Sequence, residues 1–530
     1  MNAAASVYGK GRDPERPLLV GSVKSNIGHI ESAAGIAAFI KTVLSMNKGV
    51  IPESLHLETP NPNFEWDQKP VRITSDKTDW PTNSARPPLA GVNAFGLSGT
   101  NAHVLVEGYG TPTADGAETG GTGSPAGAPQ PIPVSPPEQA DDVSISDELT
   151  TERTVRLLPL SGKSEGALRE SAKRYLSWLD GEEGSASDAT LSDMVWTASV
   201  GRSHFPHRAG LVFSDAEELR RQLRALAATD ESGNEEMPRE ATKAVFAYTG
   251  SEAKWIGMGE ALYRSEPVAR AVLDRCDDLI RQERGVSLLD VMFGRSGIEH
   301  DLNDAAWAEP ATYALQCALT AQWLSVGIRP SAVVAQSSSR IAAAQATGVF
   351  SLEEGLRIAA GLGELKEAGT EPESQAASES LQKTLDGVTL AAPSLPLVSS
   401  VSGQLVESVG ELEIDYWIRE EQTPTLLSDH VEALAQLDVD VVVGIGTDST
   451  MGRRISDAWP DPSEVPVTLS ALESPPNDGE SPEFGGGVMR AVAQVYQAGL
   501  DISFPGLFAG EVRRRVSIPS YPFQRRRHWL

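Results

Sequence analysis

The sequence predicts an α/β protein with more than one domain. Short apolar runs such as PLLVGS, AVFAYT and VDVVVG are typical of buried strands, and glycine-containing turns follow them. Segments with helical spacing of apolar residues, such as ESAAGIAAFIKTVLSMN and LQCALTAQWL, lie between these runs. Alternation of strands and helices favours sheets covered by helices. A chain of 530 residues is also too long for one hydrophobic core, so two to four domains are expected.

Composition excludes several classes of function. The formal net charge of −28 disfavours nucleic acid and anionic membranes as partners. Two cysteines, Cys276 and Cys317, rule out a disulfide framework and fit a cytoplasmic location. The N-terminus has no apolar segment typical of a signal peptide, and no apolar run approaches the roughly 18 residues of a membrane span. The eight histidines are scattered, so no metal site is expected.

Composition and patterning divide the chain into five segments. Residues 1–108 and 243–475 have an α/β rhythm, and residues 154–242 look like a small α+β unit. Residues 109–153 are rich in Pro, Gly, Ser and Thr and contain acidic residues, which predicts a flexible linker. Residues 476–530 appear loop-rich and end in the basic and aromatic stretch YPFQRRRHWL. We expect this stretch to dock on an acidic surface of the chain, with Tyr521, Phe523 and Trp529 as apolar anchors.

The first candidate site is the stretch VGSVKSNIGHIESAAG, which places Lys24 and His29 in one turn between a strand and a helix. A helix that starts just after His29 favours negative charge there. A neutral imidazole at that point can donate a hydrogen bond to an enolate or thioester oxygen. On composition alone, a structural or merely solvated role is favoured for both residues.

This stretch, together with GVNAFGLSGTNAHVLVE, resembles the C-terminal half of the ketosynthase domain of type I modular polyketide synthases, which has a thiolase-like fold. The family condenses acyl groups with a cysteine thiol and two histidines. The resemblance implies that His29 is one of these histidines, that Lys24 supports it, and that Phe95 and Gly96 line the thiol pocket. Residues 1–108 contain no cysteine, so the chain alone is not expected to condense.

The rest of the chain resembles the segments that follow a ketosynthase in these synthases. LLPLSGKS and VGRSHFPHRAG resemble the linker domain after the ketosynthase, VFAYTGSEAKWIGMG and the segments after it resemble the acyltransferase, and YPFQRRRHWL resembles the linker that follows the acyltransferase. The expected fold is therefore a partial thiolase-like half, a small α+β linker domain and a truncated α/β-hydrolase-like acyltransferase core.

The nucleophile turn of the acyltransferase is altered. The family has a Gly-His-Ser-x-Gly turn, in which glycines relieve crowding between strand and helix. Here Ala335 and Ser339 replace the glycines and Gln336 replaces the histidine. Ser337 keeps the hydroxyl, but we expect it to lose the geometry that exposes it. The interpretation is a vestigial, inactive nucleophile.

Other acyltransferase features are altered too. Ser251 and Glu252 change the segment that supports the oxyanion hole, and Leu362 stands where the family has the arginine that pairs with the malonyl carboxylate. Only a short polar stretch stands between Gly361 and Ser394, where the family has a ferredoxin-like subdomain with the histidine base. His300 and His430 are expected to be surface residues.

These observations leave three hypotheses open. The chain takes part in polyketide chain extension by acyl transfer and decarboxylative condensation on a carrier protein, inactive alone and completed by a complementary ketosynthase N-terminal half. Alternatively, it is a non-catalytic docking scaffold for a carrier protein or a discrete acyltransferase. The third hypothesis is a truncated gene product. The resemblance implies a dimer and the phosphopantetheine of a partner acyl carrier protein, while the chain itself is expected to bind no cofactor or metal.

Overall fold

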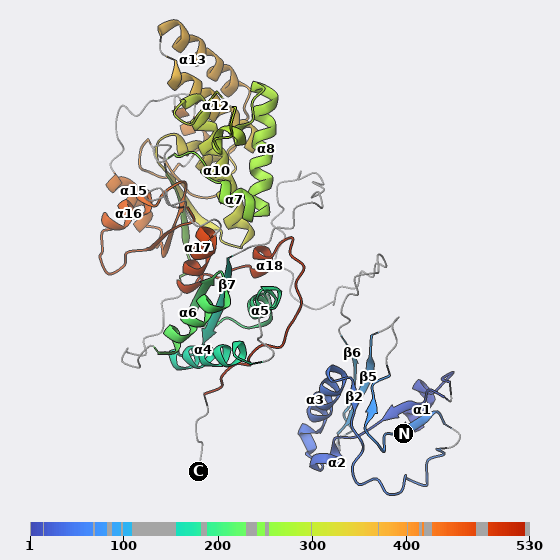
Figure 1. The fold of residues 1–530 in the computed structure, drawn as a ribbon. Helices are drawn as coiled ribbons and strands as arrows, with labels where there is room; N and C mark the ends of the chain where they lie inside the picture. The colour runs from blue at the N-terminus through green and yellow to red at the C-terminus, as the bar shows by residue number, and fades with distance from the viewer. Residues whose placement is uncertain are drawn as a thin grey trace. The chain divides into compact units, whose positions relative to one another are not determined.

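The computed structural model divides the chain into two compact units, residues 1–140 and residues 141–530, which we call unit 1 and unit 2 (Figure 1). It describes residues 2–13, 15–66, 69–81, 87–96, 99–108, 155–181, 188–228, 241–249, 254–297, 299–368, 370–399, 401–406, 408–412, 416–417, 427–472 and 486–524. The expected linker at 109–153 lies outside these residues. Both units mix helices and strands, so the predicted α/β class is confirmed.

Unit 1 consists of short strands around one longer helix. Its helical segments are α1 (Asn2–Tyr8), α2 (Lys24–Ile27), the 3₁₀ turn η1 (Glu31–Ala33) and α3 (Ala34–Asn47). Its strands are β1 (Leu18–Val20), β2 (Val50–Ile51), β3 (Val71–Ile73), β4 (Thr78–Asp79), β5 (Leu89–Phe95) and β6 (Asn101–Glu107). They form three two-stranded sheets, of which β1–β3 is parallel and β2–β4 and β5–β6 are antiparallel.

The apolar core of unit 1 is small. One cluster of buried apolar side chains comprises Ala5, Phe64 and Val71. The start of α3 lies against the end of β5, because a Cβ on Gly35 would come within 3.0 Å of the Cβ of Ala94. The opposite side of α3 exposes a row of apolar residues, Ile36, Ile40 and Leu44. Spacing of four residues places this row on one face of the helix, where no described element of unit 1 covers it.

Unit 2 contains a two-stranded and a five-stranded sheet. The strands are β7 (Arg156–Gly162), β8 (His207–Phe213), β9 (Ala244–Tyr248), β10 (Pro330–Ala335), β11 (Leu397–Val398), β12 (Val441–Ile445) and β13 (Val467–Ser470). The larger sheet is parallel, with the order β11-β10-β9-β12-β13. The smaller sheet pairs β7 with β8 in antiparallel register.

The helices of unit 2 follow the strands along the chain. They are α4 (Glu165–Leu179), α5 (Asp188–Gly201), α6 (Ala216–Ala228), α7 (Glu260–Ser265), α8 (Pro267–Arg284), α9 (Leu288–Met292), α10 (Ala305–Ser325), α11 (Arg340–Ala346), α12 (Leu352–Glu367), α13 (Glu371–Asp386), α15 (Leu427–Ala435), α16 (Thr450–Asp457), α17 (Gly486–Gln497) and α18 (Phe504–Leu507). The structure also describes two 3₁₀ turns in unit 2, η4 (Ser337–Ser339) and η5 (Val409–Leu412).

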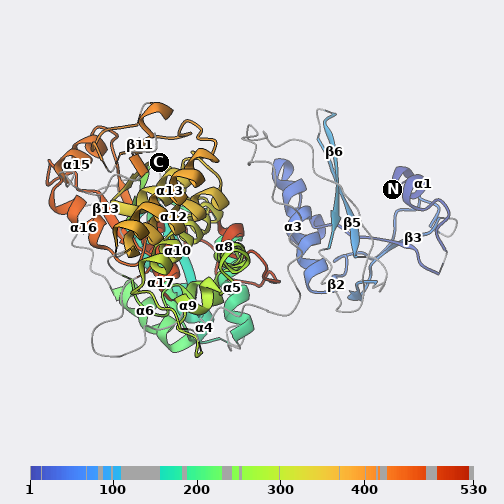
Figure 2. The ribbon, with the colours of Figure 1, turned by 90° about the horizontal axis from the view of Figure 1, so that it is seen from above.

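Helices cover both faces of the five-stranded sheet (Figures 1 and 2). On one face, Phe246 and Val443 pack in a large cluster with residues of α8, α10, α12 and α17. On the other face, Val245 and Val442 pack with residues of α15 and α16. Because both faces are buried, the strands are apolar without alternation, and this explains the continuous run AVFAY in β9.

The strand order places a switch point between β9 and β12. The chain adds β10 and β11 on one side of β9, and β12 and β13 on its other side. In open α/β sheets of this kind, ligand sites lie outside the carboxyl ends of the strands at such a point. The ends of β9 and β12 approach closely here: a Cβ on Gly446 would lie 1.8 Å from Thr249 Oγ1.

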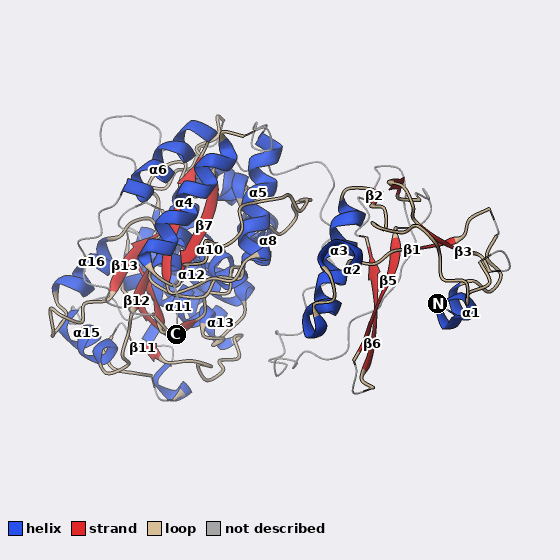
Figure 3. Ribbon diagram, turned by 90° about the horizontal axis from the view of Figure 1, so that it is seen from below, coloured by secondary structure: helices blue, strands red, loops and turns tan. Residues whose placement is uncertain are grey.

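Helix α17 lies between the small sheet and the large one (Figure 1). Figure 3 shows strands of both sheets, such as β7 and β12, in red among the helices of unit 2. Ala493 packs against Gly210 of β8, where an added Cβ would lie 2.8 Å from the Ala493 Cβ. At its start, Gly487 lies against the carbonyl of Ala471, just after β13. Residues 476–530 are therefore less loop-rich than predicted, since a buried helix within them contributes to the core beside both sheets.

The segment after α18 runs in extended form along α4 and α5. Tyr521 packs on Phe205 with ring centroids 5.1 Å apart and accepts a hydrogen bond from the Lys163 backbone N–H at 2.9 Å, so it anchors the segment as predicted. Phe523, in contrast, is 78% exposed and is not an anchor. Trp529 lies outside the described residues.

The expected docking on an acidic surface is tested only in part, because Arg525, Arg526 and Arg527 lie outside the described residues. In the described part of the segment, most contacts are made by backbone carbonyls. Arg174 donates to the Ser520 and Tyr521 carbonyls, and Arg202 donates to the Ile518 and Pro519 carbonyls. An extended segment without a strand partner presents backbone carbonyls that need donors, and arginine supplies several from one side chain. One acidic contact does occur, from Asp193 to the Arg514 N–H at 3.0 Å.

Candidate functional site

Ser337 stands on a sharp turn between strand β10 and helix α11. Its φ is +53°, in the left-handed region that non-glycine residues rarely adopt. The side chain is half-buried, and the 3₁₀ turn η4 begins at this residue. Strand, strained serine and helix follow one another as in a nucleophile elbow. The expectation that Ser337 loses the elbow geometry is therefore wrong, because the backbone keeps the strained conformation without the flanking glycines.

A buried network of hydrogen bonds supports this turn on its interior side. The Ser339 hydroxyl donates to the Thr249 carbonyl at the end of β9. Gln316 of α10 donates through Nε2 to the same carbonyl at 2.6 Å and to Ser339 Oγ at 2.8 Å. Ser339 replaces a glycine of the family turn and places its hydroxyl where a buried carbonyl and amide can bond it. The loss of that glycine is thus compensated by hydrogen bonds.

Arg340 and Gln336 secure the two ends of the turn. The buried guanidinium of Arg340 donates to the Ser337 carbonyl and to the Trp417 carbonyl, each at 3.0 Å. Gln336 Oε1 lies 3.5 Å from Arg454 Nη1 on α16, at the outer limit of a hydrogen bond. Gln336, which directly precedes Ser337, has an amide in place of an imidazole and cannot accept a proton near neutral pH. These contacts fix the turn but give Ser337 no general base.

In the part of the chain that the structure describes, no hydrogen bond joins Ser337 to either histidine of the acyltransferase-like core. His300 is exposed, as predicted, and stacks on Trp307 with ring centroids 4.9 Å apart. His430, predicted at the surface, is only 2% exposed. Its Nε2 donates to the Ser399 carbonyl at 3.1 Å, and its Nδ1 is buried without a hydrogen-bond partner. His430 lies on the amphipathic helix α15, whose buried side faces the sheet, which explains the wrong prediction.

Burial sets the protonation of His430. Desolvation lowers the pKa of its imidazole below the usual range, and the nearby Arg454 adds to this effect. The hydrogen bond to Ser399 and the charge of Asp429 oppose it. Since an imidazolium here would leave a buried Nδ1–H without an acceptor, the neutral ring is favoured near neutral pH. We therefore assign His430 a structural role.

The carboxylate-binding position of the family is apolar here. Leu362, on α12, is 5% exposed and belongs to the large core cluster. The preceding residue, Gly361, is closed off as well, because a Cβ placed on it would lie 3.1 Å from Leu381 Cδ1 of α13. The polar stretch after Gly361 thus forms a helix with two buried leucines, Leu381 and Leu385, where only a weakly patterned segment was expected. The altered oxyanion segment at Ser251 and Glu252 lies outside the described residues.

In unit 1, a backbone contact sets the tautomer of His29. The Glu31 N–H donates to His29 Nδ1 at 2.9 Å, so the proton of the neutral ring is on Nε2. The imidazole is exposed, and its Nε2–H can donate to an oxygen of a ligand. Lys24 opens the short helix α2 and is also exposed. This arrangement is what a site that stabilises an enolate oxygen requires from a histidine.

Phe95 lies at the same end of unit 1 as His29. It ends β5, and the preceding Ala94 contacts Gly35 at the start of α3, six residues after His29. Phe95 is 73% exposed, so in this unit it does not close a pocket. Gly96 follows it and donates its N–H to the Thr100 carbonyl at 2.7 Å, which starts the return to β6.

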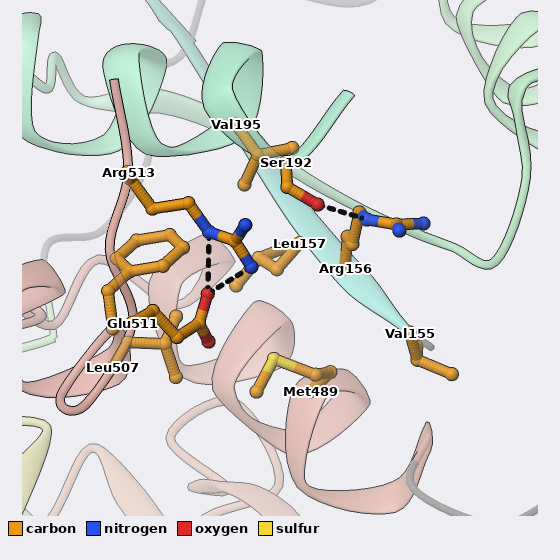
Figure 4. A pocket seen from close by; sticks show the side chains of 10 residues that line it. Val155, Arg156, Leu157, Ser192, Val195, Met489, Leu507, Glu511 and Arg513 are labelled. Carbon is orange, nitrogen blue, oxygen red and sulfur yellow. Dashed lines mark hydrogen bonds and ion pairs between the residues drawn. The ribbon is translucent and has the colours of Figure 1, made fainter. Parts of the chain in front are cut away.

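A small cavity elsewhere is unsuited to a substrate (Figure 4). It measures about 20 Å³ and lies between β7, α5, α17 and the segment after α18, lined in part by Leu157, Val195 and Met489. This is room for about one water molecule. The Glu511–Arg513 ion pair, at 2.6 Å, closes one side of it.

Two further findings limit the kinds of site. Within the described residues, no three histidine, cysteine, aspartate or glutamate side chains are grouped as a metal site would need. The helices that the structure describes include none with the length and apolarity to cross a membrane.

Three family models match this chain. Residues 1–58 match the β-ketoacyl synthase C-terminal domain, residues 156–223 match a CurL-like polyketide synthase C-terminal segment, and residues 245–391 match the acyl transferase domain. Polyketide synthase GfsE of Streptomyces halstedii is 31% identical over 610 residues, with all of this chain and 15% of that protein covered. Erythronolide synthase EryA3 of Saccharopolyspora erythraea is 29% identical, with all of this chain and 18% of that protein covered. Along its whole length the chain is thus similar to segments of polyketide synthases.

Solved acyltransferase domains share the fold of unit 2. The acyl transferase domain of ZmaA has a TM-score of 0.59 at 18% identity, covering 69% of this chain and 99% of that domain. The acyltransferase domain from module 8 of the salinomycin polyketide synthase has a TM-score of 0.55 at 19% identity, covering 67% and 98%. The family models confirm the predicted similarity to ketosynthase and acyltransferase domains. The chain spans less than a fifth of the two curated relatives named above.

Sequence reasoning missed three residues that the structure places at these sites. Gln316 and Arg340 hold the Ser337 turn, and Lys41 reaches the loop that carries His29. Lys41 did leave a signal, because it is the one charged residue in the apolar helix AGIAAFIKTVLSMN. Gln316 and Arg340 left none, since the acceptors that they bond are backbone carbonyls distant in sequence.

Proposed function

We propose that this chain takes part in polyketide chain extension, with unit 1 contributing His29 and Lys24 to a condensing site and unit 2 serving as a non-catalytic body. The thiol of that site comes from a ketosynthase N-terminal half that residues 1–108 do not contain, wherever that half is encoded. The observation that carries the proposal is the fixed tautomer of His29, whose Nε2–H is exposed beside Lys24 and the start of α3.

The proposed chemistry is a decarboxylative condensation. A malonyl thioester on the phosphopantetheine of an acyl carrier protein loses CO₂, and the electron pair remains as an enolate. The enolate carbon attacks the carbonyl of an acyl group held on the cysteine sulfur, and the thiolate leaves. The Nε2–H of His29 donates to the malonyl thioester oxygen while it gains negative charge. The carrier protein and its pantetheine arm are thus substrates in this proposal.

A complementation experiment tests this proposal. The full chain is produced together with a thiol-bearing ketosynthase N-terminal half, and complex formation and condensation of a malonyl carrier protein are measured. We expect a stable complex whose condensation rate falls at least a hundredfold in His29→Ala while the complex persists. A complex that condenses equally well with His29→Ala, or the absence of any complex, would contradict it.

Unit 2 is proposed not to load acyl groups. Ser337 keeps its strained backbone, but a serine without a base is a poor nucleophile, and the position of the carboxylate-binding arginine is the buried Leu362. With labelled malonyl-CoA we expect no stoichiometric adduct, and the same background in Ser337→Ala. An adduct that depends on Ser337 would refute this part of the proposal and leave the role of His29 untouched.

A second candidate function is a docking scaffold for a carrier protein or a discrete acyltransferase. The observation that favours it is the packing of α13 on α12. Leu381 and Leu385 of α13 are buried, so the apolar core is intact beside the altered catalytic positions. Binding of a discrete acyltransferase to the full chain, unaffected by deletion of unit 1, would support this function. Binding lost with unit 1 would assign the contact to the ketosynthase-like part.

A further inference from the structure

One lysine in unit 1 makes side-chain hydrogen bonds that neither the formation of its helix nor packing in the small core explains. Lys41 lies in the middle of α3 among apolar residues and is half-buried. Its ammonium donates to Asn26 Oδ1 at 2.8 Å and to the Ser22 carbonyl at 3.2 Å. Both acceptors belong to the loop that leads to His29. Burial lowers the pKa of Lys41, which is the cost of placing a cation at this position.

One of the two acceptors lies before helix α2 and the other lies within it. Ser22 precedes α2 and also accepts the Ser25 hydroxyl at its carbonyl, at 3.1 Å, while its own Oγ accepts the Lys24 N–H at 3.2 Å. Asn26 lies within α2. The loop then turns at Gly28, whose φ is +74°, and reaches His29. A single cation therefore fixes the loop on either side of Lys24.

We infer that Lys41 is a positioning residue for His29: it bonds the loop before the imidazole, while the Glu31 N–H bonds the imidazole after it. The ring is held from two directions, one through α2 and one through the start of η1. An apolar residue at position 41 would fit the helix equally well but could not hold the loop. An arginine keeps the charge and several donors, so it is the conservative replacement.

This inference deepens the proposed function, because the position of His29 matters only if His29 acts on an oxygen of a substrate. Its test is chosen to be independent of condensation. Long-range ¹H–¹⁵N spectra of the full ¹⁵N-labelled chain report the tautomer of each histidine, and His29→Gln identifies the signals of His29. His103 is a control in the same unit, since it bonds Tyr8 and Asn93 and does not touch Lys41.

We expect the parent chain and Lys41→Arg to show His29 with the proton on Nε2 and one set of signals. In Lys41→Met the loop is released, and His29 is expected to show both tautomers or exchange-broadened signals, with His103 unchanged. Asn26→Ala removes one of the two acceptors at an exposed position and should give a smaller change of the same kind.

Unchanged His29 signals in both Lys41→Met and Asn26→Ala would overturn the inference. If Lys41→Met also shifts the signals of His103, unit 1 has lost its fold in that variant, and Asn26→Ala decides. Failure of the proposed function has a different signature: the tautomer of His29 would depend on Lys41 as expected, yet the complemented chain would not lose condensation in His29→Ala.

Discussion

Units 1 and 2 differ in what they retain. In unit 1, a hydrogen bond fixes the tautomer of the motif residue His29. The apolar core of this unit is small: among the residues described there, the buried apolar side chains are Ala5, Phe64, Val71 and Val92. Unit 2 has three clusters of buried apolar side chains and a sheet covered on both faces, while Gln336 and Leu362 stand where the family resemblance implies a histidine and an arginine. The geometry of a candidate site and the extent of the apolar core therefore vary independently between the two units, because different residues determine each.

Among the residues that the structure describes, most of the exposed large apolar side chains belong to unit 1, although unit 2 is much the longer of the two. Two of them, Val104 and Leu105, lie next to each other on β6 and face opposite sides of a two-stranded sheet. Since an isolated pair of strands is marginally stable in water, unit 1 is expected to gain stability from whatever covers it. The predictions below test this difference, from the largest expected effect to the smallest.

The largest effect is expected from truncating a leucine in the core of unit 2. Leu319 of α10 is 1% exposed, so Leu319→Ala should cost about 2–5 kcal/mol of unfolding free energy by loss of burial and creation of a cavity. The matched variant Leu44→Ala, in α3 of unit 1, removes the same atoms from a side chain that is 52% exposed. It should cost less than about 1 kcal/mol. Equal costs, measured by denaturant unfolding of each unit, would mean that α3 is covered in solution.

A second effect concerns the buried network under Ser337. Gln316→Ala removes the donor to Thr249 and Ser339 and should destabilise unit 2 by about 1–3 kcal/mol. Gln316→Glu is the control of similar size, in which a carboxylate faces the Thr249 carbonyl and the destabilisation should be at least as large. A neutral outcome for Gln316→Ala in thermal unfolding would show that the turn does not depend on this network.

The third effect is a pH dependence confined to unit 2. The pKa values of His430 and His204 are lowered, mainly by burial, so the unfolded chain binds protons more readily than the folded chain. The stabilisation by the neutral rings is complete above the unfolded pKa of about 6.5 and is lost as the pH falls below it. Each histidine contributes at most about 1.4 kcal/mol per pH unit.

The control for this pH dependence is His430→Leu, which removes one of the two titrations. Its unfolding free energy should change less between pH 7 and pH 5.5 than that of the parent chain. The same slope in both proteins would show that His430 does not titrate across this range in the folded state. His29, which is exposed, offers a comparison in unit 1: His29→Gln should leave the slope for unit 2 as it is.

The smallest effect on stability is expected for Ile40→Ser on the uncovered face of α3. Ile40 is 51% exposed, so this change should alter the unfolding free energy of the chain by about 0.5 kcal/mol or less. The same variant should bind a ketosynthase N-terminal half more weakly if that half covers α3. Undiminished binding in the complementation experiment would place the contact on another face of unit 1.

Much of the fold could be predicted from the sequence. Helical spacing predicted α3 and α10, and continuous apolar runs predicted β9 and β12. These elements are dictated by local periodicity together with burial on both faces. Helix α17 was missed because its neighbours in sequence are polar and rich in proline, and its apolar face has meaning only beside the two sheets.

The candidate sites could be predicted in part. The motifs placed His29, Lys24 and Ser337 at turns. The structure has Ser337 on a turn and His29 between α2 and η1, whereas Lys24 begins the short helix α2; their catalytic roles stay predictions. The conformation of Ser337 could not be inferred from the lost glycines, because Gln316 and Arg340 support the turn from distant segments.

The amino-acid sequence by itself determined which residue types stand at each position: a thiol-free first segment with His29 and Lys24, and an elbow with its histidine and glycines replaced. Only the tertiary structure decided how those residues are presented. It set the proton of His29 on Nε2, kept the strained φ of Ser337, buried His430 and left α3 uncovered. The physical reason is that residue identity fixes which groups are available to react, whereas tautomer, strain and burial depend on hydrogen-bond partners and neighbours that lie far apart in the chain.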